Sequence, residues 1–149
     1  MSSPSRGEGP DQNPGPAEIK ELLRATKTIA VVGLSDNPGR ASNHVSAYMQ
    51  AQGYQVIPVN PALTEALGEQ AYPSLRYLPG PVDMVNVFRK PDAVPGVIAD
   101  AIAVGAKAVW LQEGVVHHEA AAQARAAGMV VVQDRCIFKE HLKAFGGRA

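Results

Sequence analysis

Residues 33–42, which read GLSDNPGRAS, combine residue types that bind phosphate groups. Gly33 permits a sharp backbone turn and the close approach of a ligand. Ser35 and Ser42 supply hydroxyl donors, and Arg40 supplies a permanent positive charge whose planar fork of donors matches phosphate oxygens. The sequence therefore predicts a pyrophosphate site made by Gly33, Ser35, Arg40 and Ser42. The alternative is an ordinary turn that carries a surface arginine.

This loop lacks the two best-known glycine motifs for nucleotides. Ser35 stands where the second glycine of G-x-G-x-x-G would be, and the closing Gly-Lys-Ser/Thr of a Walker A loop is missing. Dinucleotide sites usually also place Asp or Glu near the end of the second strand. This chain reads Pro58-Val59-Asn60-Pro61 there, an apolar and rigid rim that suits the face of an adenine. We therefore expect Pro58, Val59 and Asn60 to face a base.

Arg89 and Lys90 form a second cluster of positive charge, directly after the apolar run 82–88. Parallel strands end at the same edge of a sheet, so this cluster and the Gly33 loop are expected on one edge. There the two cations would meet a further phosphate group. The alternative is a pair of solvated surface side chains.

The chain offers few groups for catalysis. Glu113 is the best candidate for an acid or base because it follows an expected strand, but a structural hydrogen bond is an equal alternative. Cys136, the single cysteine, is either a packed thiol or a thiol that exchanges with a ligand. The histidines and Cys136 lack the spacing of a zinc site, and we can place no Ser/His/Asp triad. We assign no catalytic and no metal-binding residue.

Short apolar runs alternate with helical patterns along the chain. The expected strands are residues 28–32, 55–59, 82–88, 107–111 and 129–133. The expected helices are residues 17–26, 42–52, 92–104, 117–127 and 137–145. This alternation predicts an α/β fold, a doubly wound sheet of about five parallel strands with helices on both faces. With the common strand order 3-2-1-4-5, the ligand site lies beside strands one and four, at residues 33–42 and 112–116.

Length and composition fit one domain in a reducing compartment. The chain has 149 residues, 46% of them hydrophobic, and we expect a flexible leader at 1–16 before a single domain at 17–149. Fourteen basic residues balance 14 acidic ones, which gives no support for a nucleic acid or an anionic membrane as partner. No run approaches the roughly 18 apolar residues of a membrane helix. With one cysteine and no secretory pattern, a cytoplasmic location is expected.

Six segments in order resemble the stand-alone CoA-binding domain proteins, which are similar to the N-terminal domain of the succinyl-CoA synthetase α subunit. The segments are GLSDNPGRAS at 33–42, GYQVIPVNP at 53–61, YPSL at 72–75, DMVNVFR at 83–89, WLQEG at 110–114 and DRC at 134–136. The resemblance covers residues 17–145 and implies a Rossmann-like fold. It also implies that coenzyme A (CoA), or an acyl-CoA, binds through its ADP part.

Carried over by position, the resemblance assigns phosphate contacts to Gly33, Ser35, Arg40 and Ser42. It assigns the adenine to Pro58, Val59 and Asn60. The resemblance to the synthetase fades at Arg89 and Lys90, and it is their charge that predicts contact with a further phosphate, such as the 3′-phosphate of CoA. The synthetase keeps its phosphorylated histidine in a further domain, so we expect a binding module without the ligase reaction. Such a module would act with a protein partner or as a homo-oligomer. The alternatives are an NAD(P)-binding oxidoreductase and a subunit of an enzyme that acts on acyl-CoA.

Overall fold

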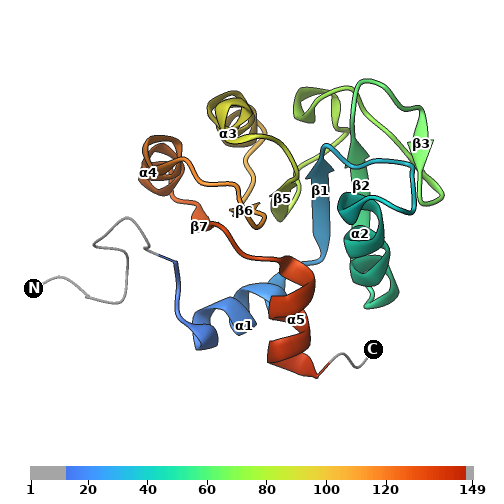
Figure 1. Cartoon of the computed structure of the whole chain (residues 1–149). Helices are drawn as coiled ribbons and strands as arrows, with labels where there is room; N and C mark the ends of the chain where they lie inside the picture. Colours follow the sequence, from blue (N-terminus) through green and yellow to red (C-terminus); the bar gives the residue numbers. More distant parts are fainter. Residues whose placement is uncertain (1–12, 147–149) are drawn as a thin grey trace, which may run out of the picture.

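The computed structural model describes residues 13–146, in which strands and helices alternate (Figure 1). Residues 1–12 of the expected leader lie outside the described part. Asn13 lies inside it and contacts the domain: its side-chain amide donates to the carbonyl of Gln133 at 2.8 Å and accepts from the N–H of Gln133 at 2.7 Å. Between residues 13 and 146, no helix is both long enough and apolar enough to cross a membrane.

A five-stranded parallel sheet forms the centre of the molecule, and this confirms the expected fold class. All four pairs of neighbouring strands are parallel. The strands are β1 (Thr28–Val32), β2 (Gln55–Val59), β5 (Met84–Val87), β6 (Ala108–Leu111) and β7 (Val130–Val132).

Helices cover both faces of the sheet (Figure 1). Side chains alternate along β1: Ala30 and Val32 pack in one hydrophobic cluster, and Ile29 and Val31 pack in the other. The first cluster lies under α3 (Val94–Ala103) and α4 (His118–Ala126). The second lies under α1 (Pro16–Ala25), α2 (Ala41–Ala51) and α5 (Ile137–Phe145). Trp110 of β6 is fully buried in the second cluster, as expected for a core residue.

The strand order differs from the predicted 3-2-1-4-5. The sheet runs β2-β1-β5-β6-β7, which is 2-1-3-4-5 when strands are counted along the chain. All four residues of β5 are buried, so this strand cannot lie at an edge, whereas β2 and β7 each begin with an exposed residue. The strand order therefore reverses between β1 and β5. Because ligands of such sheets bind where the strand order reverses, the expected ligand site lies beside strands one and three and not beside strands one and four.

The connection from β2 to β5 crosses over β1 and contains only short elements. A hairpin of β3 (Glu65–Ala66) and β4 (Glu69–Gln70) comes first, followed by the 3₁₀ helix η2 (Leu75–Tyr77). Ser74 caps η2, because its hydroxyl accepts from the N–H of Arg76 at 3.3 Å. A second 3₁₀ turn, η3 (Pro91–Ala93), joins β5 to α3. This connection brings residues 73–75 close to α3 at the carboxyl edge of the sheet.

Asp83 ties the amino ends of β1 and β5 together. Its carboxylate accepts from the N–H of Lys27 at 2.8 Å and of Thr28 at 3.1 Å. Its own N–H donates to the Thr28 hydroxyl at 2.8 Å. Burial alone would raise the pKa of Asp83, but the N–H donors of Lys27 and Thr28 and the charge of Lys107 outweigh burial, so the pKa lies below its ordinary value.

We predict that Asp83→Asn lowers the free energy of unfolding at pH 7 by about 1 kcal/mol, because a neutral amide accepts these N–H groups less strongly. A carboxylate with a lowered pKa in the folded state stabilises above the unfolded pKa of about 4. This stabilisation is lost as the pH falls through the folded-state pKa. Urea unfolding at pH 7 and at about pH 3 should therefore show the gap to wild type closing at the lower pH.

The control is Asp92→Asn, at an exposed position of η3, which should stay within about 0.5 kcal/mol of wild type at both pH values. A gap for Asp83→Asn that persists at the lower pH would contradict a stabilising role of the charge.

Candidate functional site

Two cavities open at the carboxyl edge of the sheet, and they share Gly33, Phe88 and Arg89. The first, of about 640 Å³, lies between the end of β2, residues 73–75 and α3. The second, of about 500 Å³, lies between the Gly33 loop, residues 88–91 and residues 112–115. A long ligand could occupy both by crossing Gly33.

Gly33 joins the ends of three strands. Its φ is 90°, and a Cβ at this position would lie 2.4 Å from the carbonyl oxygen of Phe88. Its N–H donates to the carbonyl of Val59 at 2.9 Å, and the N–H of Phe88 donates to the carbonyl of Val32 at 2.9 Å. Only glycine fits both the conformation and the space, so the predicted role of Gly33 as a sharp turn is also a packing requirement.

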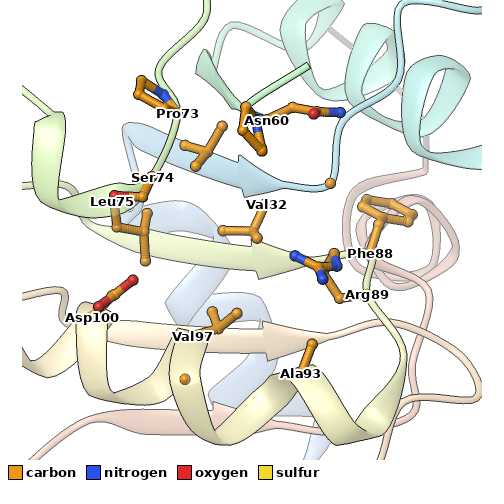
Figure 2. Close-up of a pocket in the computed structure, with 14 residues that line it drawn as sticks. Val32, Asn60, Pro73, Ser74, Leu75, Phe88, Arg89, Ala93, Val97 and Asp100 are labelled. Carbon is orange, nitrogen blue, oxygen red and sulfur yellow. The ribbon is translucent and has the colours of Figure 1, made fainter. Parts of the chain in front are cut away.

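The first cavity has an apolar floor and a polar rim (Figure 2). Val32, Val59 and Leu75 form part of the floor, and all three are buried. Arg89 extends over the cavity from the segment after β5, while Asp100 lines the opposite end from α3 (Figure 2). The carboxylate of Asp100 accepts from Nε of Arg76 at 2.6 Å. Apolar walls with a few placed polar groups are typical of cofactor sites.

The two serines of the Gly33 loop hold its shape. The Ser42 hydroxyl accepts from the N–H of Ser35 at 3.0 Å, and the Ser35 hydroxyl accepts from the N–H of Asn37 at 3.0 Å. The amide of Asn43 donates to the carbonyl of Ser35 at 2.8 Å. Both hydroxyls keep their proton for donation to a ligand.

Ser42 does not begin helix α2, contrary to our expectation. The helix starts at Ala41 and Arg40 occupies the N-cap position, because the hydroxyl of Ser42 is directed to the N–H of Ser35 instead. The start of α2 nevertheless lines the second cavity through Ala41 and Ser42. The unpaired N–H groups of a first helical turn favour an anion at this place.

Three cations line the second cavity: Arg40, Arg89 and Lys90. All three are exposed, and Arg89 reaches both cavities. The carboxylate of Glu113 also lines the second cavity, but it is already paired with Nζ of Lys139 at 3.0 Å. The lining therefore carries excess positive charge and suits an anionic ligand.

Two of the three residues predicted to face an adenine line the first cavity. Val59 and Asn60 line the first cavity, whereas Pro58 is buried in β2 and lines neither cavity. Successive side chains of a strand point to opposite faces, which explains why Pro58 is turned away. The Asn60 amide donates to the carbonyl of Leu34 at 2.9 Å, and its oxygen accepts from the N–H of Ala62 at 2.9 Å. Asn60 therefore stabilises the loop as well as lining the cavity.

Sequence reasoning missed one whole wall of the first cavity, which Pro73, Ser74, Leu75, Ala93, Val97 and Asp100 provide. These residues come together because β5 lies beside β1, and this brings α3 over the carboxyl end of β1. The segment YPSL at 72–75 was the available signal, since it was one of the six segments of the resemblance.

The residues considered for catalysis are not grouped in one place. Glu113 lies at the second cavity, where its hydrogen bond and its charge raise the pKa of Lys139. Cys136 is half-buried, has a free thiol, and lines neither cavity.

His117 caps α4 by accepting from the N–H of Ala120 at 3.1 Å, and His141 packs in an aromatic cluster with Tyr48. In the described part of the chain, no three His, Cys, Asp or Glu residues could together hold a metal ion.

Comparisons with known proteins show what this chain is similar to in sequence and in fold. Residues 27–142 match the family described as the CoA binding domain. The uncharacterized protein YneT of Bacillus subtilis (strain 168) is 48% identical over 130 residues, which cover 87% of this chain and 96% of YneT. The solved structure of a hypothetical protein from Pyrococcus horikoshii OT3 has a TM-score of 0.88 and 36% identity, and the match covers 98% of this chain and 100% of that one.

A longer protein matches along a fraction of its length. The ADP-forming acetate–CoA ligase I of Archaeoglobus fulgidus (strain ATCC 49558) is 25% identical over 127 residues. These residues cover 78% of this chain and 18% of the ligase. The similarity therefore concerns one part of that enzyme.

We predict that Gly33→Ala lowers the free energy of unfolding by at least about 2 kcal/mol, because the methyl group meets the Phe88 carbonyl at an unfavourable φ. Urea unfolding measures the effect. Gly80→Ala is the matched control, since no atom lies within 4 Å of a Cβ there and its φ is not positive. That variant should stay within about 0.5 kcal/mol of wild type. Equal stabilities of the two variants would contradict the packing role of Gly33.

Proposed function

The chain belongs to the CoA-binding domain family, and from this premise we propose that it binds CoA, or an acyl-CoA, across the two cavities at the carboxyl edge. The observation that carries this proposal is the junction at Gly33. An apolar cavity and a cationic cavity meet there, and Arg89 lines both. CoA has a matching sequence of parts: a base and ribose, a pyrophosphate, and a long pantetheine arm.

The adenosine end is assigned to the first cavity. Its floor of Val32, Val59 and Leu75 offers an apolar surface for a flat base, and its volume of about 640 Å³ is within the range of cofactor pockets. Asp100 and Ser74 supply polar groups at the rim for the amino group or the ribose hydroxyls.

The pyrophosphate is assigned to the space above Gly33. The missing side chain lets phosphate oxygens approach the backbone, and the start of α2 supplies N–H donors. Arg40 and Arg89 approach this space from two different segments, so they can neutralise charge from both sides. Lys90 adds a third cation, for the pyrophosphate or for the 3′-phosphate.

The pantetheine arm is assigned to the second cavity, along residues 112–115. Two observations support this direction over the reverse one. The base finds its apolar surface in the first cavity, and the second cavity is lined by polar groups such as the hydroxyls of Ser35 and Ser42 that suit the amides of pantetheine.

We further propose that the chain acts as a CoA-binding module and that any reaction on the thiol is carried out by a partner. The similar ligase from Archaeoglobus fulgidus is matched along 18% of its length, which leaves most of that protein for other tasks. Within the second cavity Glu113 is paired with Lys139, and Cys136 lies outside the lining. A location in the cytoplasm, where CoA and free thiols coexist, fits this role.

We predict micromolar binding of CoA by titration calorimetry, with Arg89→Ala weaker by at least about tenfold, because each lost charge-assisted hydrogen bond costs about 1.5 kcal/mol or more. Arg40→Ala should weaken binding by a similar factor. Acetyl-CoA should bind like CoA, and NAD and ADP should bind more weakly because they lack the 3′-phosphate and the arm.

Arg24→Ala is the matched control, since this exposed arginine lies on α1, before the amino end of β1. It should leave the affinity for CoA unchanged. Tight binding of NAD with no binding of CoA would replace the proposal by a dinucleotide site. Equal losses in all three arginine variants would contradict the assignment of Arg40 and Arg89.

A further inference from the structure

The backbone of Asp134 has a positive φ, which is uncommon for a residue with a side chain. Within residues 13–146, only Leu67 and Asp134 combine a side chain with a positive φ, of 53° and 57°. Leu67 and Gly68 form the two-residue turn of the β3–β4 hairpin, a turn type that requires positive φ at both positions. Asp134 lies instead between β7 and α5, where no hairpin imposes this conformation. Figure 1 shows this short connecting segment.

The conformation of Asp134 directs its carboxylate at the wall of the second cavity. Its Oδ1 accepts from the N–H of Gly114 at 2.7 Å, across 20 residues of sequence. Hydrogen bonds from an N–H to a carboxylate are shorter and stronger than those between neutral groups. Uncommon backbone conformations in folded proteins cluster at functional sites. The long-range hydrogen bond of Asp134 is therefore a candidate for a functional contact.

Side-chain contacts of Gln112 and Glu113 hold the same wall. Oε1 of Gln112 accepts from the N–H of Ile137 at 3.4 Å, and Nε2 of Gln112 donates to Oδ1 of Asn86 at 2.6 Å. Glu113 pairs with Lys139, but both side chains are exposed, so this ion pair adds little. Residues 112, 113 and 114 are thus each bonded to the segment 134–139, and all three line the second cavity.

Of these contacts, the Asp134 bond is the one that can position the backbone at Gly114. Gly114 itself has a φ of 83°, and the N–H of Val115 donates to the carbonyl of Gln112 at 2.9 Å, so residues 112–115 form a tight turn closed by its own backbone bond, to which the Asp134 carboxylate adds an anchor from outside. Without the carboxylate, the N–H of Gly114 would lose its partner, and the glycine would gain freedom at the cavity wall.

We propose that Asp134 is a positioning residue for the arm-binding half of the site: its carboxylate anchors the turn 112–115 in the place where it receives the pantetheine arm of CoA. This inference rests on the proposed function. Asp134 does not touch the adenosine end, because it lines neither cavity and its contact is confined to the wall of the second. Its removal therefore affects one end of the ligand and leaves the other unchanged.

The test measures the dissociation constants of CoA and of adenosine 3′,5′-bisphosphate, which carries the adenosine end without the arm. Asp134→Ala should weaken CoA binding about tenfold. It should change the affinity for the bisphosphate by less than about twofold. Asp134→Asn keeps an oxygen acceptor and tolerates positive φ, so it should restore most of the affinity for CoA. Glu119→Gln, which removes one negative charge from an exposed position of α4, should affect neither ligand.

Asp134→Gly covers the case in which the alanine variant fails to fold. Glycine adopts the conformation without strain and lacks the carboxylate, so it should show the same selective loss for CoA. Equal weakening of the binding of both ligands, or no weakening for either, would overturn the positioning role of Asp134. The proposed function would still hold in that case, provided that the wild-type protein binds CoA. Failure of wild type to bind either ligand would overturn the proposed function and this inference with it.

Discussion

The carbonyl oxygen of Phe88 occupies the space that a side chain at position 33 would need, and this close approach determines the carboxyl edge of the sheet. Because β1 and β5 are neighbours, the backbone that leaves β1 passes against the end of β5. The N–H groups of Gly33 and Phe88 then bond to the ends of β2 and β1. Three strand ends are held at one point, and both cavities open from it.

Much of the fold could be predicted from the sequence, because each strand is a short apolar run between residues that end strands. The bounds of β1, β2 and α5 are those expected. The strand order could not be derived from the alternation, since both common orders satisfy it. Asn86 of β5 is buried and its Oδ1 accepts from Gln112, a contact that no local sequence pattern indicates.

The candidate site was predictable where its residues follow one another along the chain. Gly33 and Arg40 lie in the loop after one expected strand, and Arg89 directly follows another expected strand. Their places in the sequence therefore predict that all three lie at the carboxyl edge of the sheet. The wall formed by Ser74 and Asp100 depends on how the chain crosses from β2 to β5, and apart from the segment 72–75 no local pattern indicates that path. Pro58 lines neither cavity because side chains alternate along β2, so that Val59 faces the first cavity and Pro58 faces away.

The paired amide of Asn13 has a consequence for how copies of this molecule meet one another. An outermost strand presents N–H and C=O groups that can template a strand from a second molecule. Here the side-chain amide of Asn13 hydrogen-bonds to both the N–H and the C=O of Gln133, as a peptide group of a neighbouring strand would. Gln133 lies just beyond the outermost strand β7. Because β7 is only three residues long, the two groups that Asn13 occupies beside it are no longer open to a strand from a second molecule.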